Sequence, residues 1–328
     1  MKKIVIAPIF NDTHLVKLQI PNIIKSINPD YILYNEGMFP SGPESTTNVD
    51  NDFVNKYTLD GKRGFDYEEL QDVISDAQKK YKDTKIMLNP MEYTSTDAPT
   101  NYYHGCNNFS DFGIEIEEGD LIFPYEGDVF HHEDDADTIK EACNKLEPNQ
   151  GLKTIWVDFI VNQYYAEEKT LKPFFKAETG RQRRFVIKYG TEDYYRNVLM
   201  NFMTQKYDML EDLEMITYHY AWFRPGKYAE MRLAQLNRDP QYWNFFLSSI
   251  ARVPQFKYKR IRVRPNPPLD PKLTHAWIRF CDFDHPEDIK SHPNYVEPLS
   301  DYLVDKIITQ EETLWLKTSY SFLNIYQT

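Results

Sequence analysis

The chain has 328 residues, of which 50 are acidic and 38 are basic, so its formal net charge is −12. That length allows one large α/β domain or two smaller ones, and the excess of acid is atypical of proteins that coat nucleic acid or bind anionic membranes. The three cysteines, Cys106, Cys143 and Cys281, are widely spaced and form no C-x-x-C motif, which favours free thiols in a reducing compartment.

The hydropathy pattern gives no sign of a membrane or a secretory pathway. No stretch approaches the roughly 20 apolar residues of a transmembrane helix. The first apolar run, residues 4–10, is short and is interrupted by Pro8, which is not typical of a signal peptide. We therefore expect a cytoplasmic protein.

The N-terminal part predicts a parallel β-α-β unit. Residues 3–8 form an apolar run that indicates a buried strand. Asn11-Asp12-Thr13 offers a helix cap, and apolar residues at helical spacing predict a helix over 13–27, kinked or restarted at Pro21. Residues 31–34 predict a second strand, which ends at Asn35-Glu36-Gly37.

The later elements follow in chain order. Up to residue 150 we expect a long functional loop over 38–63, a helix over 67–81, a strand over 85–88, an irregular stretch over 92–112, a strand over 121–123 and a helix over 134–146. Beyond residue 150 we expect strands over 154–161, 184–188 and 215–220, helices over 192–203, 226–236 and 242–250, a proline-rich loop over 265–271 and a terminal amphipathic helix over 301–324.

Two carboxylates follow the buried strand that ends at Pro124. Glu126 and Asp128 are separated by Gly127, and residues i and i+2 of an extended segment point to the same side. The glycine allows a ligand or a backbone segment to approach closely. Hard oxygen ligands in this arrangement suit a divalent cation that carries phosphates, although an ordinary acidic loop after a strand has the same pattern.

Two further groups of polar residues lie at expected strand ends. His219 closes a strand and is followed by Arg224 and Lys227 at a helix start; a neutral imidazole can ligate a metal, and the two cations can neutralise phosphate. A half-buried histidine at a strand end is the simpler alternative. The ends of the first two strands meet at the edge where open α/β sheets bind nucleotides.

These features together resemble a GT-A-fold glycosyltransferase of the family-2-like kind. The resemblance rests on the β-α-β start, the acidic pair, the segment His219-Tyr-Ala-Trp-Phe-Arg-Pro225, and the stretches Glu36 to Thr46 and Asp284-His285-Pro286. It covers roughly residues 3–290, and it departs from the family pattern at Glu126, where an aspartate is usual.

The resemblance implies an α/β fold: a GT-A-like mixed, mostly parallel sheet flanked by helices, with a C-terminal helical extension. It implies a catalytic domain over 1–285, with a nucleotide-binding half over about 1–150 and an acceptor half over about 151–285, and the extension over 286–328. It places Mn²⁺ or Mg²⁺ on Glu126, Asp128 and His219. The implied donor-binding residues are Pro8, Asn11, Asp12, Glu36, Gly37, Trp222, Arg224 and Lys227, with a UDP-sugar favoured as the donor.

An inverting transferase also needs a base that takes the proton of the acceptor hydroxyl. Residues 190–193 resemble the family's x-E-D motif, which makes Asp193 the candidate and Asp158, within an apolar strand, the reserve. Alternatively, Glu192 and Asp193 only complement the dipole of a helix start, and a retaining mechanism would need no such base.

The identity of the acceptor is left open between a glycan, lipid-linked or small acceptor and a modified (hydroxymethylated) DNA base, as in a viral enzyme. The segments Arg181–Arg184 and Arg252–Arg264 are basic, and Phe256 and Tyr258 interleave the second. That pattern suits a groove that tracks phosphates and stacks bases, or an amphipathic edge strand with solvated charges.

Three other interpretations compete with these. The pair His131-His132 invites a zinc site, but adjacent residues of an extended segment point opposite ways, so we expect surface or loop residues. A metal-dependent hydrolase or nuclease could use the same acidic and histidine cluster, but would need further carboxylates. A non-catalytic sugar-binding protein is the third alternative, given the 24 tyrosines and 20 phenylalanines.

Overall fold

The computed structural model describes most of the N-terminal two thirds of the chain and shorter stretches of the remainder. The described residues are 1–38, 51–92, 98–159, 165–167, 182–201, 209–220, 224, 227–228, 230–231, 260–265, 276–280, 283–293, 295, 313–314 and 323–325. Of the sequence-predicted elements, the helix over 242–250 and most of the loop over 265–271 lie outside these residues, and of the helix over 226–236 only 227–228 and 230–231 are described, as helix.

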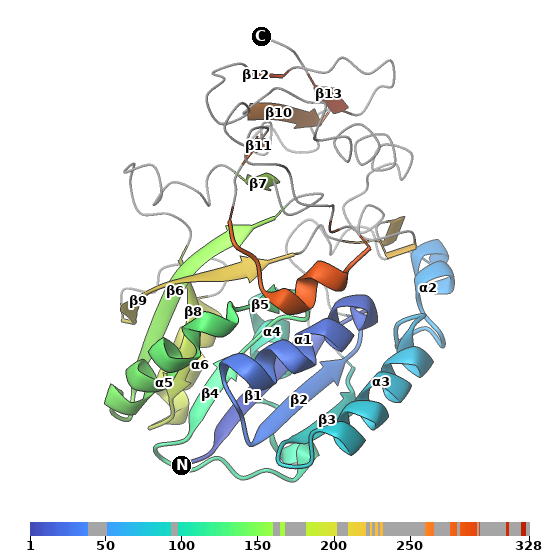
Figure 1. Cartoon of the computed structure of the whole chain (residues 1–328). Helices are drawn as coiled ribbons and strands as arrows, with labels where there is room; N and C mark the ends of the chain where they lie inside the picture. Colours follow the sequence, from blue (N-terminus) through green and yellow to red (C-terminus); the bar gives the residue numbers. More distant parts are fainter. Residues whose placement is uncertain are drawn as a thin grey trace. The chain divides into compact units, whose positions relative to one another are not determined.

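An eight-stranded sheet forms the centre of the fold (Figure 1). Its spatial order is β3 (Lys85–Pro90), β2 (Tyr31–Glu36), β1 (Lys3–Ile9), β4 (Leu121–Pro124), β8 (Gln182–Lys188), β6 (Gln150–Asp158), β9 (Glu211–His219) and β5 (Val129–Phe130). The first four strands are mutually parallel, whereas β8 runs antiparallel to both β4 and β6. The predicted mixed α/β class is confirmed.

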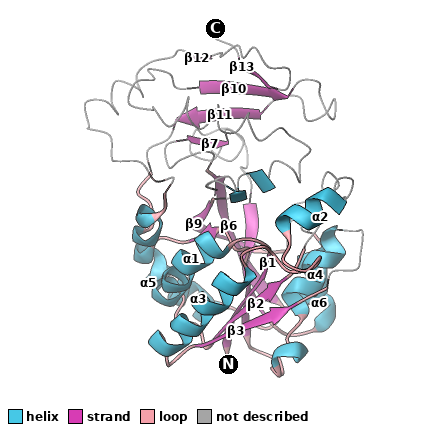
Figure 2. Cartoon of the chain, turned by 90° about the vertical axis from the view of Figure 1, so that its right-hand side faces the viewer, coloured by secondary structure: helices cyan, strands magenta, loops and turns pink. Residues whose placement is uncertain are grey.

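Helices cover both faces of this sheet. Successive residues of a strand point to opposite faces, so a single strand contributes side chains to two core clusters. Val5, Ala7 and Ile9 of β1 belong to one core cluster, which also contains buried residues of α1 (Thr13–Ser26), α3 (Tyr67–Lys80) and α5 (Ala136–Lys145). Ile4 and Ile6 belong to the other cluster, with α4 (Ala98–Asn107) and α6 (Glu192–Met200). Figure 2 shows the two helical layers on either side of the sheet.

Two local predictions were wrong, and one alternative at a third place is excluded, for reasons that lie in tertiary packing. The expected loop over 38–63 contains the short helix α2 (Asn51–Tyr57), and the irregular stretch over 92–112 contains α4 and a 3-10 turn, Ser110–Phe112. Burial of Tyr102 and Cys106 in the second core outweighs the weak helical propensity of an Asn- and Tyr-rich segment. Helix α1 runs through Pro21 without restarting, because Ile20 and Ile23 beside it are buried against the sheet.

A second, five-stranded sheet contains β12 (Thr313–Leu314), β10 (Arg260–Pro265), β11 (Ala276–Phe280) and β7 (Tyr165–Glu167), with β13 (Leu323–Ile325) also paired to β10. The prediction of one helix over 301–324 was wrong at 313–314 and 323–324, where pairing with β10 produces strand. Strand β10 has partners on both sides, so it is not the edge strand that its alternating charges suggested.

Contacts divide the chain into two compact units, and each contains separate stretches of sequence. Unit 1 comprises Met1–Trp156, Gln182–Thr217 and Pro286–Asp288, and unit 2 comprises Val157–Arg181, Tyr218–His285 and Ile289–Thr328. The expected boundary at residue 150 is not followed, because β8 and β9 return to the first sheet.

In place of the expected helical start of the extension, Glu287–Ser291 forms a short 3-10 helix. Among the described helices, none combines the length and apolar character needed to cross a membrane.

Candidate metal centre

The turn after β4 presents the predicted acidic pair. Strand β4 is fully buried and ends at Pro124, and the Val129 amide donates to the Glu126 carbonyl over 3.3 Å, which closes a tight turn before β5. The Gln19 amide, buried in α1, donates to the carbonyls of Glu126 and Val129 over 2.7 and 2.8 Å. The Tyr34 hydroxyl holds Gln19 in turn over 2.9 Å. The backbone that carries the two carboxylates is therefore held at several points.

His219 meets this pair, as predicted. It is the last residue of β9, a strand of the same eight-stranded sheet and the neighbour of β5. One ligand atom from each of Glu126, Asp128 and His219 lies within 4.8 Å of the other two. Asp128 and His219 are 7% and 8% exposed, and in a partly desolvated site a cation gains more from such ligands than in open water. These three residues could hold a metal ion.

Asp158 lies against His219. The two residues close the adjacent strands β6 and β9, and the Asp158 carboxylate is hydrogen-bonded to Nδ1 of the imidazole. Both side chains are buried. This contact leaves Nε2 as the ring nitrogen that can face a cation, and carboxylates in this position orient metal-ligating histidines. Asp158, the reserve candidate for the catalytic base, is thus hydrogen-bonded to the predicted metal-ligating histidine.

Aromatic rings fix the residues next to this pair. Phe159 is stacked on Tyr218 and Tyr220, with ring centroids 5.8 and 5.3 Å apart, and its edge contact with His285 spans 4.6 Å. The Tyr220 hydroxyl is hydrogen-bonded to Nδ1 of His285 over 2.7 Å, and the Tyr218 hydroxyl donates to the Asp284 carbonyl over 2.7 Å. Asp284 and His285, which carried part of the resemblance, therefore contact residues next to Asp158 and His219.

Two arginines reach Glu126 from β8. Arg183 Nη1 lies 3.5 Å and Arg184 Nη2 lies 4.0 Å from Glu126 Oε1, and both side chains are almost fully buried. This burial contradicts the prediction that Arg181–Arg184 forms an exposed nucleic-acid surface at these two positions, while Arg181 lies outside the described residues. Because β8 is antiparallel to β4, its first residues lie just beyond the end of β4, where Glu126 is.

Gly127 permits the approach of Asp12 to the same turn. A Cβ atom at position 127 would lie 2.9 Å from the Cβ and Oδ2 atoms of Asp12 and from Cγ2 of Ile9. Such contacts are tighter than packed proteins tolerate, so the close backbone approach that the sequence predicted is present. It places the predicted donor-binding residue Asp12 beside the acidic pair.

Glu36 lies at the end of β2 in an almost closed polar site. Its Oε1 accepts a hydrogen bond from the Gly64 amide over 2.7 Å, and its Oε2 has no hydrogen-bond partner among the described residues. Burial, reinforced by the nearby Asp66 carboxylate, raises the pKa of Glu36 to about 8. Burial also raises the pKa of Asp66, whose Oδ2 accepts from the Thr13 amide over 3.0 Å. A protonated Glu36 can donate a hydrogen bond at neutral pH.

Asn11 completes this second group of polar residues. It adopts a left-handed backbone with φ of 54°, and its side-chain amide donates to the Tyr57 carbonyl over 2.9 Å. A Cβ at Gly64 would lie 2.3 Å from Asn11 Oδ1. The sequence did not predict a role for Gly64 and Asp66, because both fall between the loop expected over 38–63 and the helix expected from residue 67, where no periodic pattern marks them.

Of the remaining predicted donor-binding residues, Pro8 and Gly37 lie at the ends of the first two strands. Pro8 is buried within β1, and the Gly37 amide donates to the Ile9 carbonyl over 3.1 Å, so both belong to the same sheet edge. Arg224 is buried and Lys227 is exposed at a helical position. Trp222 lies outside the described residues.

Asp193, the first candidate for the base, lies at the other edge of the sheet. It is exposed in the first turn of α6, which follows β8 and is capped by the Thr191 hydroxyl. Lys188 at the end of β8 pairs with Leu121 at the start of β4, whereas Glu126 follows the end of that strand. This position does not support the base role, and it suits the alternative of a carboxylate at a helix N-terminus.

His131 does not lie at the surface, contrary to the prediction. It is fully buried, with Nδ1 bonded to the Tyr125 hydroxyl and Nε2 to the Thr217 hydroxyl over 2.9 Å. Burial lowers its pKa to about 3, so the ring is neutral. His132 is partly exposed and caps the turn that follows by accepting from the Asp134 amide. The pair forms no zinc site, because its two rings serve different structural contacts.

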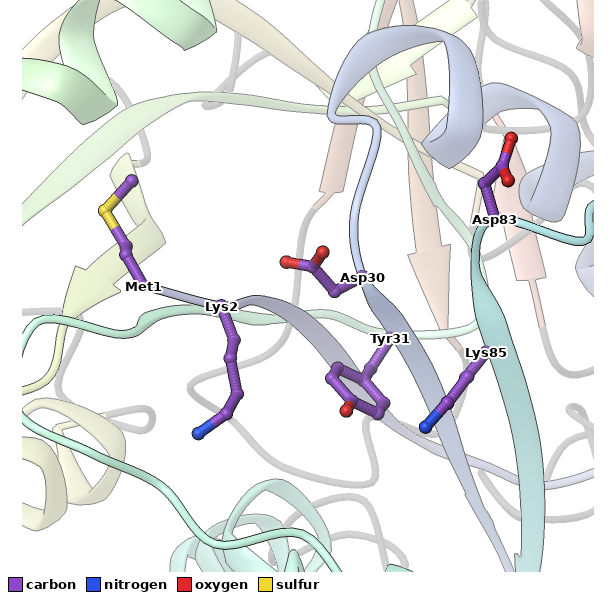
Figure 3. Close-up of a pocket in the computed structure, with 6 residues that line it drawn as sticks. All are labelled: Met1, Lys2, Asp30, Tyr31, Asp83 and Lys85. Carbon is purple, nitrogen blue, oxygen red and sulfur yellow. The ribbon is translucent and has the colours of Figure 1, made fainter.

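A hollow of about 230 Å³ lies at the opposite edge of the parallel strands (Figure 3). It is lined by Met1, Lys2, Asp30, Tyr31, Asp83 and Lys85. These residues precede or begin β1, β2 and β3, whereas the acidic pair follows the end of β4. The hollow is therefore separate from the candidate metal centre. Lys2 in it is paired with Asp120 and Glu117.

No protein-family model matches the chain, and a search of curated proteins finds no match either.

Proposed function

We propose that this protein is a metal-assisted glycosyltransferase that moves a sugar from a nucleotide-sugar donor, with a UDP-sugar favoured, to an acceptor hydroxyl. The observation that supports this proposal is the convergence of Glu126, Asp128 and His219 at the carboxyl edge of the parallel strands. Open α/β sheets bind nucleotides at that edge. A GT-A-like arrangement of the sheet is part of the same proposal.

The charges around the site favour a divalent cation. The carboxylates of Asp128 and Glu126 lie together, and the guanidinium groups of Arg183 and Arg184 lie near that of Glu126. Two carboxylates and one imidazole suit Mn²⁺, while Mg²⁺ prefers oxygen ligands alone. When bound, such a cation supplies a Lewis acid for a leaving diphosphate.

The donor's nucleoside would lie along the same edge, towards β1 and β2. Asn11 and Glu36 follow or end those strands and offer polar groups that are buried beside Gly64. A protonated Glu36 would donate to an acceptor atom of the base or ribose. The acceptor would be a glycan, a small molecule or a hydroxymethylated DNA base, the last through Arg252–Arg264.

A metal-dependent hydrolase is the second candidate, because the same group of Glu126, Asp128 and His219 could serve it. Two-metal hydrolysis requires further carboxylates, and Asp12, which lies beside the turn, is not among the residues whose ligand atoms converge. The two candidates differ in their substrates: a transferase binds a nucleotide-sugar and releases a nucleoside diphosphate, whereas a hydrolase cleaves a phosphodiester without a sugar donor.

Thermal unfolding with a panel of nucleotide-sugars, each with and without Mn²⁺, tests the proposal. A ligand at 100 times its dissociation constant should stabilise the protein by about 2.7 kcal/mol, and stabilisation should require Mn²⁺. The variant Asp128→Asn should lose the effect, whereas Asp83→Asn, exposed at the opposite edge, should retain it. Mn²⁺-dependent cleavage of a phosphodiester with no response to any nucleotide-sugar would establish the hydrolase instead.

A further inference from the structure

Helix α1 places two amide side chains, Gln19 and Asn22, in the core beneath the acidic turn. Both residues are fully buried, and Ile20 and Ile23 of the same helix belong to the apolar core. A polar group in such surroundings costs free energy unless it is hydrogen-bonded. Both amides donate to backbone carbonyls of the segment 126–131, which is distant in the sequence. They therefore tie the helix to the segment that carries the predicted metal ligands.

Gln19 spans the turn that presents the acidic pair. Its amide nitrogen donates to the Glu126 carbonyl over 2.7 Å and to the Val129 carbonyl over 2.8 Å, on either side of Gly127 and Asp128. The closing bond of the turn itself, from the Val129 amide to the Glu126 carbonyl, spans 3.3 Å, which is beyond the roughly 2.7–3.2 Å usual for such bonds. The two Gln19 bonds are shorter, so they constrain the turn more than its own closing bond does.

A third partner fixes the orientation of the Gln19 amide. The Tyr34 hydroxyl, which is fully buried on β2, donates to Gln19 Oε1 over 2.9 Å. A primary amide has two donors and one acceptor oxygen, and here the nitrogen faces two carbonyls while the oxygen faces a hydroxyl. Half a rotation of the amide would set its oxygen against both carbonyl oxygens. Only one orientation satisfies all three contacts, so the turn is held in one position.

The affinity for a cation depends on how much the ligands must rearrange when it binds. Glu126 and Asp128 carry like charges at short range, and their repulsion would separate them if the turn were free to move. Because Gln19 holds the backbone at both ends of this turn, the carboxylates are brought together when the chain folds and not when the cation binds. Ligands that are fixed in advance bind more tightly.

We propose that Gln19, oriented by Tyr34, is a positioning residue of the candidate metal centre, and that it sets the affinity of this centre for a divalent cation. This inference rests on the proposed function in one respect, the binding of a cation by Glu126 and Asp128. It adds that a buried side chain of α1, which does not touch the cation, determines how strongly the cation is bound.

Asn22 provides the matched control, because it holds the same segment at a different place. Its side-chain amide donates to the His131 carbonyl over 2.7 Å and accepts from the His131 backbone amide over 3.0 Å. Asn22 is as fully buried as Gln19, but its contacts lie beyond β5, after the turn that carries the carboxylates. Its loss should weaken the fold without moving the carboxylates.

The test measures Mn²⁺ affinity by isothermal titration calorimetry and stability by urea denaturation, both on the whole protein. Gln19→Met keeps the length of the side chain but removes both donors. Its affinity for Mn²⁺ should fall ~10-fold, the lower end of the effect of residues that support metal ligands. Asn22→Leu should lower the urea midpoint to a similar extent but leave the affinity unchanged. The EPR spectrum of bound Mn²⁺, which reports the geometry of its ligands, should broaden only in Gln19→Met.

Two results would overturn the proposal. One is an unchanged Mn²⁺ affinity in Gln19→Met, and the other is an equal loss of affinity in Asn22→Leu, which would indicate a general loosening of the core. If Gln19→Met does not fold, Tyr34→Phe replaces it, because this change removes only the hydroxyl that orients the amide. Binding of Mn²⁺ should then weaken ~3-fold, the value of one hydrogen bond, and unchanged binding would refute the role of Gln19.

Failure of the proposed metal site looks different from failure of this inference. Without that site, the wild-type protein would not bind Mn²⁺, or Asp128→Asn would bind it equally well. If the wild type binds Mn²⁺ and Asp128→Asn does not, the site is present, and the Gln19 variant alone decides whether the turn needs its support.

Discussion

The substitution Glu36→Gln should stabilise the protein at neutral pH. Burial raises the pKa of Glu36 from 4.5 to about 8 in the folded protein. An acid whose folded pKa is raised binds its proton more tightly in the folded state, so the protein loses stability as pH rises from the unfolded towards the folded value. Glutamine resembles the protonated acid and carries no such cost.

The size of the effect follows from these two pKa values. At pH 7 the unfolded chain has released the proton and the folded chain has kept it, so the linkage cost is about 3 kcal/mol, at ~1.4 kcal/mol for each pH unit above the unfolded value. The side-chain carbonyl of the introduced glutamine can still accept from the Gly64 amide, as Glu36 Oε1 does over 2.7 Å. The gain should therefore approach zero near pH 4 and reach about 3 kcal/mol near pH 7.

Urea denaturation at pH 4, 5.5, 7 and 8 measures this difference. The exposed residue Glu68 in α3 provides the control, since Glu68→Gln should leave the free energy of unfolding within about 0.5 kcal/mol at every pH. A Glu36→Gln variant that is destabilised at pH 7, or whose stability parallels that of the wild type across the range, would show that Glu36 is ionised in the folded protein.

Three further predictions concern the site and the core beneath it. Burial lowers the pKa of His131 to about 3, so the free energy of unfolding of the wild type should fall by about 2 kcal/mol relative to that of His131→Gln between pH 7 and 5; a difference between the two that stays constant with pH in urea denaturation would contradict this. Gly127→Ala should cost about 1–3 kcal/mol in thermal or urea unfolding, because its Cβ meets Asp12 and Ile9 at 2.9 Å; unchanged stability would mean that the turn relaxes freely. Asp158→Asn should weaken Mn²⁺ binding ~10- to 100-fold in titration calorimetry with the fold retained, because Asp158 orients His219, and unaltered affinity would remove that role.

Strand order and local geometry account for the part of the site that was predictable. The sequence predicted that Glu126 and Asp128 face one side because side chains alternate along an extended segment. In the structure, residues 127 and 128 lie in a tight turn, and this turn brings the two carboxylates together. His219 was identified as the end of a strand from hydrophobic patterning alone. Their convergence was an inference from the resemblance, and the spacing within 4.8 Å agrees with it.

What the sequence determined by itself is therefore local: the parallel β-α-β start, the buried strands, and the carboxylates that follow them. Tertiary structure alone decided the rest. Insertion of β8 between β4 and β6 turned Arg183 and Arg184 from an apparent surface segment into buried partners of Glu126. The same holds for Glu36, whose raised pKa depends on burial beside Gly64 and Asp66. The hydrophobic periodicity of the sequence indicates which residues are buried. Pairing between strands that are distant in the sequence determines which charged side chains contact one another.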